Sequence, residues 1–130
     1  MIKEEFIDKI AVANKTISNI KKMVQKMEQT KREAVQVYLE TNIKLDPGQR
    51  VRVYYNSSET DTDNKKLLGF GYVMGAVVDE DNGLILYPIV KEDKRTKAHT
   101  NEKFEYEGNT LELGVLPEDF EYCTVLIEIA

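Results

Sequence analysis

The residues in this chain that could perform chemistry are few and isolated. His99 is the only histidine and Cys123 the only cysteine among 130 residues, so these two residue types cannot build a zinc site within one chain. A thiol–imidazole pair would be the remaining nucleophilic arrangement. However, Cys123 falls in an apolar segment with the pattern of a strand, which indicates a small buried thiol. We therefore expect no catalytic residue, no cofactor, no metal and no disulfide within the chain.

Two further motifs resemble ligand sites without completing them. The glycines from Gly69 to Gly75 read G-x-G-x-x-x-G, which misses the dinucleotide-binding spacing by one residue and continues into strand-like residues instead of a helix. The acidic segments Glu59–Asn64 and Asp79–Gly83 lack the glycine and glutamate positions of a calcium-binding EF-hand loop. The glycines therefore predict a bent strand, and the acidic segments predict solvated turns.

Charged segments provide the candidate binding residues. The acidic loop Glu59–Asn64 and the basic stretch Lys91–Lys103 have opposite charges, and loops often carry the recognition residues of small β domains. We predict that a protein partner contacts one of these two segments. The partner-binding candidates are Glu59, Asp61, Asp63, Lys91, Lys94, Arg95 and Lys97.

Nucleic acid is the alternative partner. Small barrels bind single strands by stacking bases on aromatic side chains inside a basic groove, and the candidate platforms are Tyr54, Tyr72 and Tyr87. Arg50 and Arg52 alternate with Tyr54 on a predicted strand. Residues 45–130 contain nine Lys or Arg and 17 Asp or Glu, a balance of −8 that repels phosphate. This charge favours a protein partner over nucleic acid.

The elements that must position these residues begin with a long helix. Apolar residues recur alternately four and three residues apart, interrupted only by Lys31, which is the heptad spacing of a coiled coil. Because no Gly or Pro precedes Pro47, we expect one helix from about Lys3 to Glu40, roughly 55 Å long. The predicted oligomerisation residues are Phe6, Ile10, Ala13, Ile17, Ile20, Val24, Met27, Ala34 and Tyr38. These nine residues and Lys31 are called the seam below.

This seam is longer than the rest of the chain can cover. The residues after it would form a domain with a radius of gyration of about 12 Å, enough for about half of the seam. We therefore expect a dimer or higher homo-oligomer. In a parallel dimer, the residues that flank the seam would form no complementary ion pair; Lys9, for example, would face Asn14. Parallel, antiparallel and multi-helix arrangements all remain open.

From Gln49 onward the apolar period becomes two, which is typical of β-strands. Asn82-Gly83 is a favoured hairpin turn. The predicted strands cover residues 49–55, 67–79, 84–90, 103–106, 110–115 and 122–129, and residues 117–119 predict a helical turn. We predict an α+β chain in which residues 1–44 form a helical oligomerisation segment and residues 45–130 a small antiparallel β-barrel or sandwich.

The strand sequences VRVYY, GFGYVMGAVVDEDNG and LILYPIV resemble SH3-like small barrels of the KOW or Tudor type. That resemblance implies the same small-barrel fold for about half of the chain.

The function predicted from these patterns is a non-enzymatic, homo-oligomeric interaction module, an adaptor or inhibitor, in which the helix assembles copies of the chain and the acidic β domain binds a partner. A nucleic-acid-binding barrel and a structural subunit of a larger, phage-like particle are the alternatives. The N-terminus is charged, the apolar runs are too short to span a bilayer, and there is one cysteine. These features favour a cytoplasmic location without membrane contact.

Overall fold

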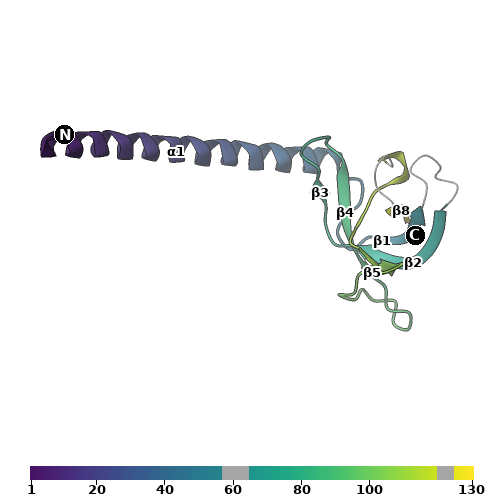
Figure 1. The fold of residues 1–130 in the computed structure, drawn as a ribbon. Coiled ribbons are helices and arrows are strands. Elements are labelled where there is room, and N and C mark those ends of the chain that lie inside the picture. The colour runs from purple at the N-terminus through teal and green to yellow at the C-terminus, as the bar shows by residue number, and fades with distance from the viewer. Residues whose placement is uncertain (57–64, 120–124) are drawn as a thin grey trace. The chain divides into compact units, whose positions relative to one another are not determined.

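The computed structural model describes residues 1–56, 65–119 and 125–130. The chain divides into two compact units, Met1–Tyr38 and Leu39–Ala130. A long N-terminal helix is followed by antiparallel strands that curl into a half-barrel (Figure 1). The predicted α+β class and the order of its elements are therefore confirmed. Within the described residues, no helix has both the length and the apolar content needed to cross a bilayer.

Helix α1 covers Lys3–Asn42, which confirms the helix predicted from heptad spacing. Glu4 and Glu5 lie in its first turn, where their charge is favourable beside the positive end of the helix dipole. None of its residues is buried. Its last residues belong to the second unit, where Leu39 and the following Ile43 pack against the core of that unit.

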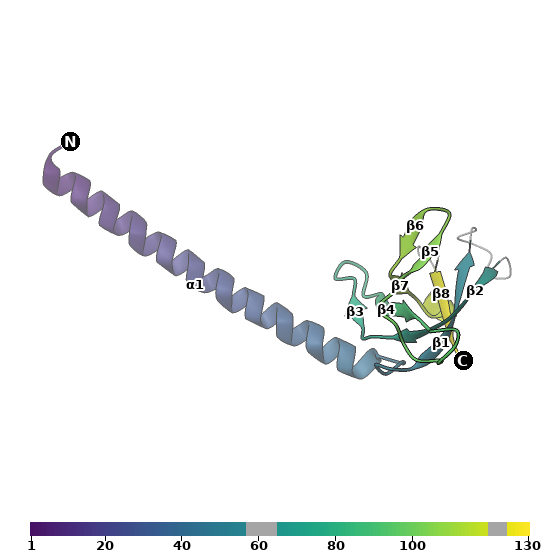
Figure 2. The same ribbon diagram turned by 90° about the horizontal axis from the view of Figure 1, so that it is seen from below.

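The main sheet has the strand order β3-β4-β2-β1-β8, and β7 pairs with β4. All pairs of named strands among the described residues are antiparallel. Strands β5 and β6 form a separate hairpin that lies beside β1 and β2 (Figure 2). The elements are β1 Arg50–Asn56, β2 Lys65–Val73, β3 Val77–Val78, β4 Ile85–Lys91, β5 Phe104–Tyr106, β6 Asn109–Leu111, β7 Leu113–Gly114, η1 Pro117–Asp119 and β8 Val125–Ile129.

The strand predicted over residues 67–79 is divided into β2 and β3. The break falls at Met74–Ala76, where Gly75 has a φ of 157°, a conformation that residues with a side chain rarely adopt. Met74 continues to bond with β4 by donating its backbone N–H to the Pro88 carbonyl at 2.8 Å. The helical turn predicted at residues 117–119 is confirmed as η1.

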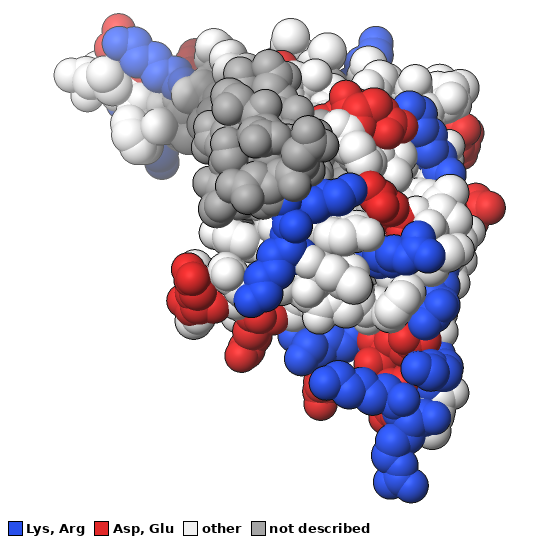
Figure 3. Space-filling model, turned by 90° about the vertical axis from the view of Figure 1, so that its right-hand side faces the viewer, with Lys and Arg blue, Asp and Glu red and all other residues white. Residues whose placement is uncertain are grey.

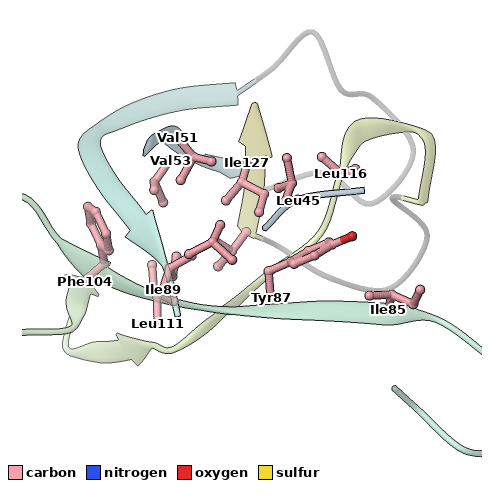
Figure 4. Close-up of a cluster of buried hydrophobic side chains, with 12 residues drawn as sticks. Leu45, Val51, Val53, Ile85, Tyr87, Ile89, Phe104, Leu111, Leu116 and Ile127 are labelled. Atoms are coloured by element: carbon pink, nitrogen blue, oxygen red, sulfur yellow. The ribbon is translucent and has the colours of Figure 1, made fainter. Parts of the chain in front are cut away.

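The core lies on the inner face of the half-barrel (Figure 4). Alternate residues of β4, namely Ile85, Tyr87 and Ile89, point into it because side chains of a strand alternate between faces. Tyr87 is 1% exposed, and its hydroxyl accepts a hydrogen bond from the Lys44 N–H at 3.0 Å. The prediction of Tyr87 as a base-stacking platform is therefore wrong.

Glycine in β2 makes room for an aromatic ring of another strand. Gly71 lies opposite Val51 in the β1–β2 register, and a Cβ atom at Gly71 would lie 2.9 Å from the Phe104 ring and 2.5 Å from the Val90 carbonyl oxygen. Phe104 is consequently 3% exposed. This close approach explains why the second strand carries a glycine facing the core.

Candidate functional site

The first candidate surface is the apolar stripe of α1. Nine of its apolar side chains are 40–67% exposed: Phe6, Ile7, Ile10, Ile17, Ile20, Met23, Val24, Met27 and Tyr38. In the middle of the helix, Ile20, Met23, Val24 and Met27 line a shallow groove of about 430 Å³ together with Glu28 and Lys31. The structure places all nine predicted oligomerisation residues on this one helix, with Ala13 and Ala34 also exposed. Their role in assembly stays a prediction.

The second candidate surface lies on the outer face of β1 and β2. Cross-strand pairing sets Arg50 opposite Tyr72 and Arg52 opposite Phe70, on the face opposite to the buried Val51. The Arg50 guanidinium lies 4.1 Å from the centre of the Phe70 ring. Basic and aromatic side chains therefore alternate across this face of the sheet.

An ion pair joins this face to the segment that follows β4. Arg50 donates two hydrogen bonds to the Glu92 carboxylate, from Nε to Oε1 at 2.8 Å and from Nη2 to Oε2 at 3.0 Å. The Glu92 side chain is only 4% exposed. Hydrogen bonding to Arg50 holds the pKa of Glu92 below its ordinary value and raises the pKa of Arg50. The pair is thus ionised and has a structural role.

A hollow of about 320 Å³, called the basic hollow below, opens between β2 and the segment from Lys91 to Phe104. Its floor and walls include the apolar side chains of Leu68, Phe70 and Phe104. The remaining lining residues are Gly69, Lys91, Glu92, Asp93, Lys94, Lys97, Thr100 and Glu102. The structure therefore brings three of the predicted basic binding residues to one concave site beside an aromatic wall.

The hollow is lined by more lysines than unengaged acids. Within the described part of the chain, Lys91, Lys94 and Lys97 form no ion pair, and neither does the neighbouring Arg95. Two of the three lining acids are already engaged, Glu92 by Arg50 and Asp93 by backbone N–H groups of its own loop. The hollow consequently has more free cations than free anions.

The loop after β4 is held by its own hydrogen bonds. The Asp93 Oδ1 accepts the backbone N–H of Arg95 at 2.8 Å and of Thr96 at 3.0 Å, which lowers the pKa of Asp93. The Asp93 N–H donates to the Ala98 carbonyl at 2.7 Å, and the Thr100 hydroxyl donates to the Lys91 carbonyl at 2.9 Å. These bonds fix the backbone that carries the lysines.

Several aromatic rings of β1, β2 and β5 already have a neighbour on one face or edge. Lys65 lies 4.5 Å from the centre of the Tyr54 ring and Lys66 lies 5.2 Å from that of Tyr106, in addition to Arg50 over Phe70. The Tyr72 hydroxyl donates a hydrogen bond to the Lys97 carbonyl. The rings of Tyr72 and His99 have an edge-to-face arrangement, with 6.3 Å between their centres. Space for a stacked base is therefore limited on this surface.

Strand β2 has a free edge beside the basic hollow. It pairs with β1 from Lys65 to Tyr72 but with β4 only from Gly71 to Val73. On the side away from β1, residues 66–70 therefore pair with no other strand among the described residues. The Phe70 carbonyl, at the end of this edge, accepts the backbone N–H of Glu92 at 3.1 Å. Sequence reasoning missed the edge, because strand pairing between distant segments has no local signal.

The remaining candidates have other positions. Glu59, Asp61, Asp63 and Cys123 lie outside the described residues. In the second acidic segment, the Asp79 carboxylate accepts the N–H of Asp81 and the Asn82 side-chain oxygen accepts the N–H of Leu84, both at 2.9 Å. These oxygens stabilise the predicted turn. The described residues contain no group of three or more His, Cys, Asp or Glu arranged to hold a metal ion.

No protein-family model, curated protein or solved structure matches this chain. The apolar stripe of α1 and the basic hollow beside β2 are therefore the basis for inferring its function.

Proposed function

We propose that the protein is a homo-oligomeric interaction module in which α1 joins copies of the chain and the unit Leu39–Ala130 binds a protein partner. The observation that carries this proposal is the stripe of half-exposed apolar side chains along a 40-residue helix. A soluble helix with such a stripe gains stability when a second surface covers it.

The area of the stripe suits a dimer. At roughly 100 Å² for each half-exposed apolar side chain, the nine residues present on the order of 900 Å². A stable protein–protein interface buries about 800 Å² on each partner. A second copy of the same helix would supply an equally long apolar stripe, so the two surfaces match in length as well as in area.

An antiparallel dimer pairs the seam residues well. With full overlap, Phe6 packs on the partner's Tyr38, Ile10 on the partner's Ala34, Ala13 on the partner's Lys31, Ile17 on the partner's Met27, and Ile20 on the partner's Val24. The one charged seam residue then lies against the smallest side chain, and its aliphatic stem can reach solvent past Ala13.

A parallel dimer would pair identical seam residues. Lys31 would face the partner's Lys31, which places two like charges in the interface. Met23, which flanks the seam, would face the partner's Glu28 in the parallel arrangement but the partner's Met23 in the antiparallel one. The antiparallel dimer is therefore our preferred arrangement. It separates the two Tyr38 residues by about 50 Å along the helix axis, so the dimer would bridge two partner molecules.

A binding role fits the second unit better than a catalytic one. Its groups with shifted pKa values, which are Lys44, Arg50, Glu92, Asp93 and Glu118, are engaged in ion pairs or in hydrogen bonds to backbone groups. A general acid or base needs a proton-transfer group that is open to substrate. Glu92 and Asp93 instead stabilise the segment that lines the basic hollow, whereas Lys44 forms an ion pair with Glu118 of η1.

Light scattering tests the assembly directly. The full chain should give a multiple of 15.0 kDa, and a dimer should give twice this mass. Changing Ile17→Asp together with Ile20→Asp should yield a monomer, because each change places a charge in a desolvated interface. The matched control, Ser18→Asp with Asn19→Asp, adds the same charges next to the seam and should keep the oligomer. A wild-type monomer at every concentration would refute the proposal, and a large defined oligomer would favour the structural-subunit alternative.

A further inference from the structure

We propose that the basic hollow receives an acidic peptide segment in an extended conformation, which adds as a strand to the free edge of β2. This inference concerns only the second unit and does not depend on the assembly of α1. It identifies where the protein binds its partner and which chemistry the partner presents.

The free edge provides the backbone part of the site. Over residues 66–69, β2 pairs with β1 alone among the strands that the structure describes, and a strand with one unpaired side offers N–H and C=O groups to a further strand. Leu68 and Gly69 of this edge line the hollow, together with Phe70, whose carbonyl already accepts the Glu92 N–H. An extended segment lying in the hollow is therefore adjacent to the backbone groups that it would pair with.

The hollow provides a place for alternate side chains of the bound segment. Its volume of about 320 Å³ is on the order of ten water molecules, which a few side chains would displace. Leu68 and Phe70, which are half-buried, form the accessible part of its apolar wall, and Phe104 is only 3% exposed. Because successive side chains of a strand point to opposite faces, a segment that alternates apolar and acidic residues can place one set against this wall and the other towards the rim.

The rim provides the charge selectivity. Lys91 lies at the end of β4, and Lys94 and Lys97 lie in the loop that follows. In Figure 3, the lower end of the molecule, formed by the segment between β4 and β5, is mostly covered by basic side chains. Of the three lining acids, Glu92 is paired with Arg50 and Asp93 accepts backbone N–H groups, so the three lysines outnumber the remaining acid, Glu102. Carboxylates of a peptide would complete this arrangement.

The site is arranged before the ligand arrives. The bidentate Arg50–Glu92 pair ties the start of the loop to the sheet, and the Asp93 bonds to Arg95 and Thr96 hold its tip. A loop with a fixed backbone loses less conformational entropy on binding. The lysine side chains can then adjust to carboxylates while their backbone stays in place.

Single-stranded nucleic acid fits this surface less well. Its bases need open aromatic faces, whereas cations lie over Phe70, Tyr54 and Tyr106. The −8 balance of residues 45–130 also opposes a polyphosphate chain. A short peptide with a few carboxylates contacts only the local excess of lysines and avoids most of this repulsion.

Fluorescence anisotropy with defined probes tests the proposal on the full chain. The probes are a fluorescein-labelled octapeptide of alternating Glu and Val, the same peptide with Lys in place of Glu, and a labelled oligothymidylate. We expect binding of the Glu–Val peptide that weakens with added salt. Weaker or no binding should follow for the other two. Equal binding of the Lys–Val peptide, or tighter binding of the oligothymidylate, would overturn the acidic-peptide assignment.

Two variants and two modified probes locate the site. Lys94→Glu with Lys97→Glu should weaken binding of the Glu–Val peptide by roughly tenfold or more. The matched control, Lys21→Glu with Lys22→Glu on α1, makes the same charge change in the other unit and should leave the affinity unchanged. Because only every second N–H of an added strand points to the edge, one probe is N-methylated at the valines and another at the glutamates, and at least one of the two should lose binding. Undiminished binding of both N-methylated peptides would refute strand addition, and equal losses in both variants would refute the hollow as the site.

The same titration on the Ile17→Asp, Ile20→Asp variant separates this inference from the proposed assembly. The affinity per chain for the Glu–Val peptide should be the same in that variant as in the wild type. An oligomeric wild-type protein that does not bind the peptide would contradict only the proposed peptide site in the hollow. A monomeric wild-type protein that binds the peptide would contradict only the proposed assembly through α1.

Discussion

Changing Gly71→Ala should destabilise the second unit through a contact that the structure defines. The added Cβ would lie 2.5 Å from the Val90 carbonyl oxygen and 2.9 Å from the Phe104 Cε2 atom, against 3.4–4 Å for an ordinary contact. Gly71 does not have a positive φ, so an alanine there suffers from lack of space and not from backbone conformation. The cost therefore measures packing between β2, β4 and β5.

The magnitude follows from which atoms must move. The Phe104 ring can shift at the expense of the core, but the Val90 carbonyl belongs to β4, whose residue Val90 pairs with Tyr72 of β2. Overpacking of a core generally costs about 1–3 kcal/mol. Replacing Gly by Ala also restricts the unfolded chain, which offsets about 0.4–1 kcal/mol. We expect a net loss of roughly 2 kcal/mol in the free energy of unfolding, near the upper part of the range because a backbone atom is involved.

Urea denaturation followed by tyrosine fluorescence measures this loss, since the chain has seven Tyr and no Trp. With a slope of about 2 kcal/mol per molar urea, the midpoint should fall by roughly 1 M. Both proteins must be compared at one protein concentration, because self-association changes apparent stability.

A second change separates the two contacts. Phe104→Leu in the Gly71→Ala protein removes the ring contact but not the contact with the Val90 carbonyl, so the alanine should cost less in this background than in the wild type, yet still more than zero. An unchanged midpoint for Gly71→Ala, or a cost that vanishes completely in the Phe104→Leu background, would refute the reasoning.

Two further predictions concern the helix and the buried ion pair. In a Cys123→Ser background, Met23→Cys should form an intermolecular disulfide on mild oxidation, because the antiparallel dimer brings the two copies of Met23 together. Ala13→Cys should form none, because the two copies of Ala13 meet only in a parallel dimer. The reverse result on a non-reducing gel would show a parallel dimer. Glu92 has a lowered pKa in the folded state, so its contribution to stability is present above its ordinary pKa of 4.5 and is lost as the pH falls through the folded value. Glu92→Gln should therefore lower the melting temperature at pH 7. The melting temperature of the variant should also fall less steeply than that of the wild type as the pH is lowered. Parallel plots of melting temperature against pH for the two proteins would contradict a stabilising Arg50–Glu92 pair.

The sequence alone determined the elements whose signals are local. The unbroken heptad spacing before Pro47 predicted α1 to within two residues at its C-terminal end, because helix formation depends on neighbours three and four residues apart. The alternation in residues 49–55 likewise predicted β1, and Asn82-Gly83 predicted the turn before β4. The basic character of residues 91–97 was also apparent from composition.

Only the tertiary structure decided which side of each strand faces the core and which segments meet. Alternation shows that a strand has two faces without showing which is buried, so Tyr87 was predicted on the wrong side of β4. The Arg50–Glu92 pair joins residues 42 positions apart, and the basic hollow combines β2 with a segment more than twenty residues later. These contacts depend on strand pairing and chain curvature, which arise from the packing of the whole unit and not from any local pattern.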